Sequence, residues 1–228
     1  LTLYAQASRG VLYPGAETYT LTRAIPMAFA ANNGWDRLTP SLSTHTEVGV
    51  QWDATPSTHV DISLFKDKVQ DRYTWSGFTP FATGTWSNQF PDYHVSGLEA
   101  SLKQGLGSSW TAFAGLTLLR PSLSNLPYAP RTALSVGVNG QVGTYRLALD
   151  AQHQTEMFSL TQDRGTFNPN TVAGFTVANA RVSRSVAGLG NRGEVYLSIH
   201  NLFDTQYAYN AGYPMPGRTI RVGLVSRF

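Results

Sequence analysis

Hydrophobic and polar residues alternate along most of this chain with a period of two. Val60, Ile62 and Leu64 fall on one side of an extended segment, and Asp61 and Ser63 fall on the other. The same alternation recurs in the segments 47–52, 98–102, 134–139 and 194–200. This pattern is typical of β-strands that have one apolar face and one polar face.

The alternation, with the turns between its segments, predicts ten strands and no helix. The predicted strands are at about residues 1–10, 41–53, 58–74, 94–104, 109–119, 130–140, 145–157, 172–185, 193–204 and 217–228. Several of them exceed the roughly 9–11 residues that a strand needs to cross a bilayer.

The links between the predicted strands alternate between short and long. Short links are expected at 54–57, 105–109, 141–144 and 187–192, and long, aromatic-rich links at 11–39, 76–93, 120–128, 158–170 and 207–217. A soluble β-sandwich has the same alternating strands but no reason to collect its long loops at one end. Outer-membrane β-barrels do so, with tight periplasmic turns and long extracellular loops. The predicted fold is therefore an all-β, antiparallel transmembrane barrel.

The amino-acid composition excludes several other classes of protein and of functional site. Charged residues make up 14% of the chain, against roughly 25% in an average soluble domain. The formal net charge is +3 and the basic residues are scattered, which does not suggest a nucleic-acid interface. The chain contains no Cys, so thiolate metal sites and Cys nucleophiles are excluded. No 18-residue apolar run and no signal-peptide pattern is present, and we expect a mature or truncated product.

The C-terminal segment carries a distinctive series of residues. The series consists of Asn201, Leu202, Phe203 and Asp204, then Tyr207, then Gly212, Tyr213, Gly217 and Arg218, and finally Phe228 at the end of an alternating strand. It resembles the C-terminus of TonB-dependent outer-membrane receptors. Further matches follow in the family's order at 4–10, 47–49, 97–99 and 127–131. Ser226 departs from the pattern, because an aromatic residue usually stands two places before the end.

The resemblance implies both a fold and a function. Such barrels have 22 strands and a plugged lumen. Residues 1–228 would then be the C-terminal part of the barrel, about its last ten strands, without the plug domain and the N-terminal strands. The implied protein sits in outer-membrane lipid, binds a metal chelate such as a ferric siderophore, haem or cobalamin, and imports it with energy from the TonB complex. Its last strand would be recognised by the outer-membrane assembly machinery.

Aromatic residues in the long links are the candidate ligand-binding residues. Exposed aromatic side chains are costly unless they pack together, meet the membrane interface or bind a ligand. The best candidates are Trp35, Phe78, Phe81, Trp86 and Tyr213. We expect a structural role for the motif residues Asn201, Leu202, Phe203, Asp204, Gly217, Arg218 and Phe228, because Asn and Asp at strand ends bond to the local backbone.

The sequence contains no catalytic motif and no convergent metal ligands. The five His residues are spread over separate segments, and Asp67 and Asp71 are interpreted as solvated strand ends. The sequence therefore predicts a transport protein with no enzymatic activity, resident metal or cofactor. The alternative function is a passive or structural outer-membrane barrel, porin-like or adhesin-like, that is complete at this length.

Overall fold

The computed structural model describes residues 1–15, 37–75, 86–88, 90–163, 166–186 and 193–226. For residues 75, 86–87, 161–163 and 166–169 it describes the backbone alone. Within these ranges, no helix is long and apolar enough to cross a membrane.

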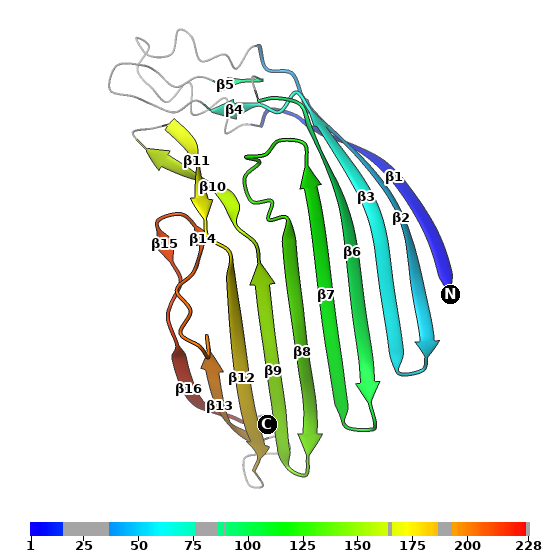
Figure 1. Cartoon of the computed structure of the whole chain (residues 1–228), viewed down its shortest axis with the longest axis vertical. Coiled ribbons are helices and arrows are strands. Elements are labelled where there is room, and N and C mark those ends of the chain that lie inside the picture. The colour runs from blue at the N-terminus through cyan, green and yellow to red at the C-terminus, as the bar shows by residue number, and fades with distance from the viewer. Residues whose placement is uncertain (16–36, 76–85, 89, 164–165, 187–192, 227–228) are drawn as a thin grey trace.

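Ten long strands form one antiparallel sheet, as predicted. They are β1 (Thr2–Leu12), β2 (Ser41–Thr55), β3 (Thr58–Gln70), β6 (Tyr93–Leu106), β7 (Trp110–Pro121), β8 (Thr132–Val142), β9 (Tyr145–Gln154), β12 (Phe175–Ser185), β13 (Glu194–His200) and β16 (Thr219–Val225). Each pairs with the long strands before and after it in the chain, so β1 and β16 are the two edges of the sheet. Figure 1 shows a curved sheet with the short turns along one end and the long links along the other.

Six short strands in the long links were not predicted from the sequence. They form three hairpins, β4 (Thr74–Trp75) with β5 (Trp86–Ser87), β10 (Met157–Asp163) with β11 (Thr166–Val172), and β14 (Ala208–Asn210) with β15 (Tyr213–Pro214). Long links in compact proteins commonly carry structure of their own. These hairpins rise above the sheet at its long-link end (Figure 1).

Some predicted strands were too long, and for two of them the backbone shows why. The strand expected at 58–74 ends at Gln70, and the strand expected at 193–204 ends at His200. The next residues, Asp71 and Asn201, both have a φ of 53°. This left-handed conformation cannot continue a strand, and Asp and Asn adopt it at lower cost than most residues.

The register separates the side chains of the sheet into a polar face and an apolar face. On the polar face Gly49, Ser63, Glu99 and Thr117 are level with one another across β2, β3, β6 and β7. All acidic residues of the ten long strands share that face: Glu47, Asp53, Asp61, Asp67, Glu99, Asp150 and Glu194.

The apolar face is largely exposed in this chain. Val48 and Leu64 are each 55% exposed, Leu149 is 50% exposed and Val222 is 74% exposed. A continuous apolar surface of this kind is unfavourable in water, and it matches the lipid-facing band of an outer-membrane barrel.

Aromatic rings on the polar face cover glycines of neighbouring strands. Phe65 lies over Gly97, and Phe113 lies over Gly137. A Cβ atom at either glycine would overlap the ring, so these positions require the absence of a side chain. The ring in turn covers the backbone that the glycine leaves bare.

Buried apolar side chains gather at the long-link end of the sheet. They are Leu126, Met157, Val172, Phe175, Val177 and Ala178. This small core joins the top of β12 to the links that precede it and fixes the position of the site described next.

Candidate functional site

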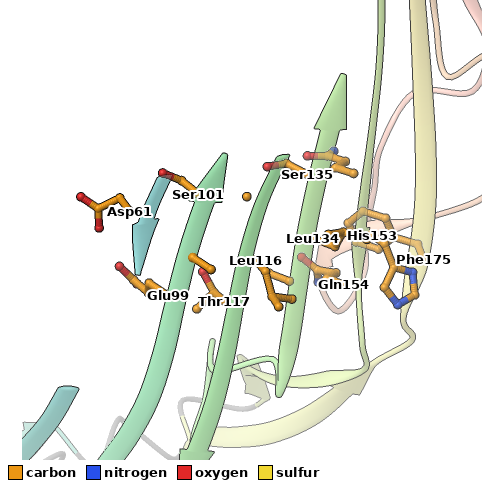
Figure 2. A pocket seen from close by; sticks show the side chains of 14 residues that line it. Asp61, Glu99, Ser101, Leu116, Thr117, Leu134, Ser135, His153, Gln154 and Phe175 are labelled. Carbon is orange, nitrogen blue, oxygen red and sulfur yellow. The ribbon is translucent and has the colours of Figure 1, made fainter. Parts of the chain in front are cut away.

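A groove of about 420 Å³ crosses the polar face in the middle of the sheet. The polar lining residues that belong to this face come from five strands: Asp61 of β3, Glu99 and Ser101 of β6, Thr117 of β7, Ser135 of β8, and Gln152 and Gln154 of β9. Phe175, the first residue of β12, forms its apolar end. Figure 2 shows these side chains arranged across adjacent strands.

The groove offers hydrogen bonds and no catalytic arrangement. Its two carboxylates, three hydroxyls and two amides suit a polar, multiply hydrogen-bonded surface. Among the described residues, the Nε2 atom of Gln154, which lines the groove, is buried and has no hydrogen-bond partner. Those residues also contain no group of three or more His, Cys, Asp or Glu side chains that could hold a metal ion.

Three aromatic rings pack together beside the groove, and one of them, Phe175, belongs to its lining. The ring of Tyr207 lies 4.7 Å from that of Phe175, and the ring of Tyr209 lies 5.3 Å from it, measured between centroids. Tyr209 accepts a hydrogen bond from Gln152 Nε2 at 2.7 Å. Burial raises the pKa of the Tyr207 hydroxyl, and Tyr209 adds to this shift. We call Phe175, Tyr207 and Tyr209 the aromatic cluster.

Asn201 holds the link between β13 and β16, residues 201–218, which carries these tyrosines. It is 2% exposed, and its side-chain oxygen accepts a hydrogen bond from the Thr205 backbone N–H at 2.8 Å. Its Nδ2 atom donates to the Thr205 and Pro216 carbonyls at 2.9 and 3.3 Å. Both ends of the link are thereby tied to one side chain. The backbone N–H of Asn201 in turn donates to Asn179 Oδ1 at 3.1 Å.

Asp204 makes a second hydrogen bond that joins the two ends of the same link. Its Oδ1 atom accepts a hydrogen bond from the Arg218 backbone N–H at 2.6 Å. A Cβ atom at Gly217 would lie 2.7 Å from that oxygen, so glycine leaves room for the carboxylate. The Leu202 N–H donates to the Ala178 carbonyl at 2.8 Å, whereas the Phe203 side chain is 71% exposed.

The structure brings few of the predicted ligand-binding residues together. Tyr213 lies in β15 and is 72% exposed, near the aromatic cluster in the chain but pointing into open space. Trp86 lies in β5, where its backbone pairs with Trp75. Trp35, Phe78, Phe81 and the terminal Phe228 lie outside the described residues.

Sequence reasoning did not single out the groove residues or Phe175. The alternation places Thr117, Ser135 and Gln152 on the polar face, but it does not show that they are neighbours. That requires the register, in which Ser135 is level with Gln152.

Ionic contacts occupy other parts of the polar face. His45 contacts Asp67 at 2.7 Å and Glu47 at 3.1 Å, and Glu47 accepts a hydrogen bond from the Tyr4 hydroxyl at 2.6 Å. Asp67 is thus paired with a histidine of β2, while its side chain stays 39% exposed near the end of β3. Near the short turns, Glu194 lies 2.7 Å from Arg181, whose guanidinium stacks on Tyr196.

Comparison with known proteins identifies the family. The family described as "TonB dependent receptor-like, beta-barrel" matches residues 1–202. The chain belongs to this family, and the sequence resemblance is confirmed. No curated protein sequence matches the chain.

Solved structures show the same fold. The ferric-catecholate import receptor Fiu from E. coli K12 aligns with 96% of this chain at 20% identity and a TM-score of 0.71. The copper transporter OprC aligns with 96% at 20% identity and a TM-score of 0.74, and the iron transporter FrpB from Neisseria meningitidis with 82% at 17% and 0.63. The aligned part is 32%, 36% and 31% of those chains, so this chain spans about a third of their length.

Proposed function

We propose that this chain is the ligand-contacting wall of an outer-membrane receptor that imports an extracellular nutrient into the periplasm with energy transmitted by TonB. The observation that carries the proposal is the groove on the polar face, whose lining residues Phe175 and Gln152 contact the tyrosines of the aromatic cluster. A ligand arriving from outside meets aromatic rings first and a hydrogen-bonding wall below them.

A metal chelate is the proposed cargo. The matched structures include a ferric-catecholate import receptor, a copper transporter and iron transporters. Organic chelates combine planar apolar groups with many acceptors, and such molecules suit tyrosine rings beside amide donors such as Gln152 and Gln154. The exposed ring of Tyr213, with Trp35, Phe78, Phe81 and Trp86, remains a proposed outer capture surface.

The two sheet edges favour a larger barrel. In a barrel closed at ten strands β1 would pair with β16, but these strands lie at opposite edges of the sheet. Unpaired strand edges are not tolerated in the hydrocarbon region of a membrane, so each edge needs a partner strand. This argues against the alternative of a passive barrel complete at this length, and for an assembly of the size seen in the matched structures.

The test is a ligand screen on the full-length gene product. Ferric catecholates, ferric hydroxamates, haem, cobalamin and a copper chelate are each titrated against the purified receptor by tryptophan fluorescence. Uptake is then measured in cells with and without TonB. We expect one class to bind and to be taken up only with TonB. Binding of none, or uptake independent of TonB, would reject the proposal.

A pair of variants tests the groove itself. Tyr207→Ala with Tyr209→Ala removes two rings of the aromatic cluster and is expected to weaken ligand binding about tenfold or more. The matched control is Tyr145→Ala, a 45% exposed tyrosine on the apolar face at the opposite end of the sheet, which should not change affinity.

A further inference from the structure

The pairing of β12 with β13 ends where the link that carries the aromatic cluster begins. The last pair at that end is Ala180 with Ile199. The chain then turns at Asn201, whose φ is 53°, and the backbone N–H of this residue donates to a side chain, Asn179 Oδ1 of β12, at 3.1 Å. Asn201 is 2% exposed, so its N–H needs this acceptor in place of water.

Asn179 is itself held by a carboxylate on β9, the other neighbour of β12. Its Nδ2 atom donates to Asp150 Oδ2 at 2.7 Å. The register makes the two residues direct partners, and both belong to the polar face. Asp150 forms no salt bridge with any residue that the structure describes. Three residues thus connect the wall to the link, and we call Asp150, Asn179 and Asn201 the amide relay.

The two ends of the amide relay permit one orientation of the Asn179 amide. The carboxylate of Asp150 offers acceptors, and the backbone N–H of Asn201 offers a donor. The amide therefore has to present its nitrogen to the first and its oxygen to the second, which is the arrangement observed. A carboxylate at position 179 has no donor, and an alkyl side chain there has no polar atom, so neither can serve both ends.

The strand that begins the relay also holds the link at a second point. Asn201 passes the first constraint on, through the hydrogen bonds of its side chain to the backbone of the link. The second constraint is direct, because Gln152 Nε2 of β9 donates to the Tyr209 hydroxyl at 2.7 Å. Gln152 and Asp150 are two residues apart and share the polar face. One strand of the wall therefore holds both the start of the link and its aromatic part.

We propose that Asp150 and Asn179 are positioning residues for ligand binding, because they fix Asn201 and, through it, the place of Tyr207 and Tyr209 beside the groove. Neither Asp150 nor Asn179 lines the groove, so they act without touching the ligand. The inference deepens the proposed function and rests on it, since the position of the tyrosines matters to a cargo only where the groove and the aromatic cluster bind one.

The first experiment needs no ligand, so it tests the amide relay separately from the proposed function. Amide hydrogen exchange of the purified full-length receptor is followed by mass spectrometry. Asn179→Asp keeps the size of the side chain, removes the donor to Asp150 and places two carboxylates side by side. We expect amide protection at residues 201–205 to fall about tenfold to a hundredfold, and protection in β6 to β8 to stay unchanged.

An exchange of the two side chains tests the polarity of the relay. In the double variant Asp150→Asn, Asn179→Asp, the new amide at position 150 donates to the new carboxylate at position 179. The second oxygen of that carboxylate accepts the bond from the Asn201 N–H. Protection should return to within about threefold of the parent. Asp150→Asn alone keeps an acceptor for Asn179 Nδ2 and should also stay within about threefold. A residue that only fills space would not be rescued in this way.

Asn139→Asp is the matched control. Asn139 is an exposed residue of β8 on the same polar face, and the same substitution there adds the same charge outside the relay. It should change protection at residues 201–205 by less than about twofold. Nitration by tetranitromethane gives a second readout. The half-buried Tyr207 should react faster in Asn179→Asp than in the parent or in Asn139→Asp, because the released link exposes its ring.

Ligand affinity is then measured in the same variants. The probe is whichever of the ferric, haem, cobalamin and copper complexes of the ligand screen binds the parent. Its affinity should fall about tenfold in Asn179→Asp and return in the double variant. An unchanged affinity in Asn179→Asp would overturn the role in ligand binding. If no complex binds the parent, the proposed function fails, and hydrogen exchange still decides whether the relay holds the link.

Three results of the exchange experiment would each overturn the proposal. They are protection in Asn179→Asp equal to that of the parent, an equal loss in Asn139→Asp, and a double variant no better protected than Asn179→Asp. Folding is checked independently by heat-modifiable gel mobility. If Asn179→Asp does not fold, Asn179→Ala against Asn139→Ala provides the same comparison without an added charge.

Discussion

Replacing Asn201 by Ala should release the link that carries the aromatic cluster. The variant loses three side-chain hydrogen bonds, two to the Thr205 backbone and one to the Pro216 carbonyl. At about 1 kcal/mol for each bond the loss is about 3 kcal/mol, and the φ of 53° at this position adds about 1 kcal/mol for an alanine. The expected destabilisation of residues 201–218 is therefore about 4 kcal/mol.

Hydrogen exchange of the full-length receptor measures this effect locally. A loss of about 4 kcal/mol corresponds to a decrease of up to about a thousandfold in amide protection within the link. The long strands β6 to β9 should keep their protection, because Asn201 makes no contact with them through these bonds. Ligand affinity should fall as well, since Tyr207 and Tyr209 lose their fixed position.

Two comparison variants separate the effect of the lost hydrogen bonds from the effect of the left-handed backbone. Asn201→Gly removes the same hydrogen bonds without the left-handed penalty, and it should be less destabilising than Asn201→Ala by about 1 kcal/mol. Phe203→Ala changes a 71% exposed residue of the same motif and should alter protection by less than about 0.5 kcal/mol. Equal protection in Asn201→Ala and Phe203→Ala would refute the reasoning.

Three further substitutions test other contacts. Gly217→Ala places a Cβ atom 2.7 Å from Asp204 Oδ1, and it should lower amide protection at the end of the link by about 1–3 kcal/mol in hydrogen exchange. Tyr209→Phe keeps the ring and removes the bond from Gln152, so ligand affinity measured by fluorescence titration should fall about fivefold. Gly97→Ala would overlap the ring above it, and a lower denaturant midpoint is expected in detergent.

The long strands were predictable because their signal is local. Alternation depends only on residues two apart, and the observed strands begin within about three residues of the predicted ones. The two largest overruns occurred where a single residue changes the backbone, at Asp71 and Asn201. A sequence pattern does not show a positive φ unless glycine marks it.

The candidate site was less predictable than the fold. The alternation assigned Glu99 and Gln152 to the polar face, but the groove depends on how far each strand is shifted against the next. The aromatic residues were selected for their exposure in long links. The two tyrosines of the aromatic cluster, Tyr207 and Tyr209, are positioned by contacts with Phe175, more than 30 residues earlier in the chain.

By itself the sequence determined the class of protein: ten two-faced strands, long links on one side, and the C-terminal motif of a family of receptors. Only the tertiary structure decided which side chains are level with one another. Gln152 and Tyr209 meet across 57 residues of chain, and Arg9 and Lys68 align across an intervening strand. Alternation determines the face of the sheet on which a side chain lies. Its level along the strands, and so its neighbours on that face, is set by the register between paired strands, which is a property of the folded sheet.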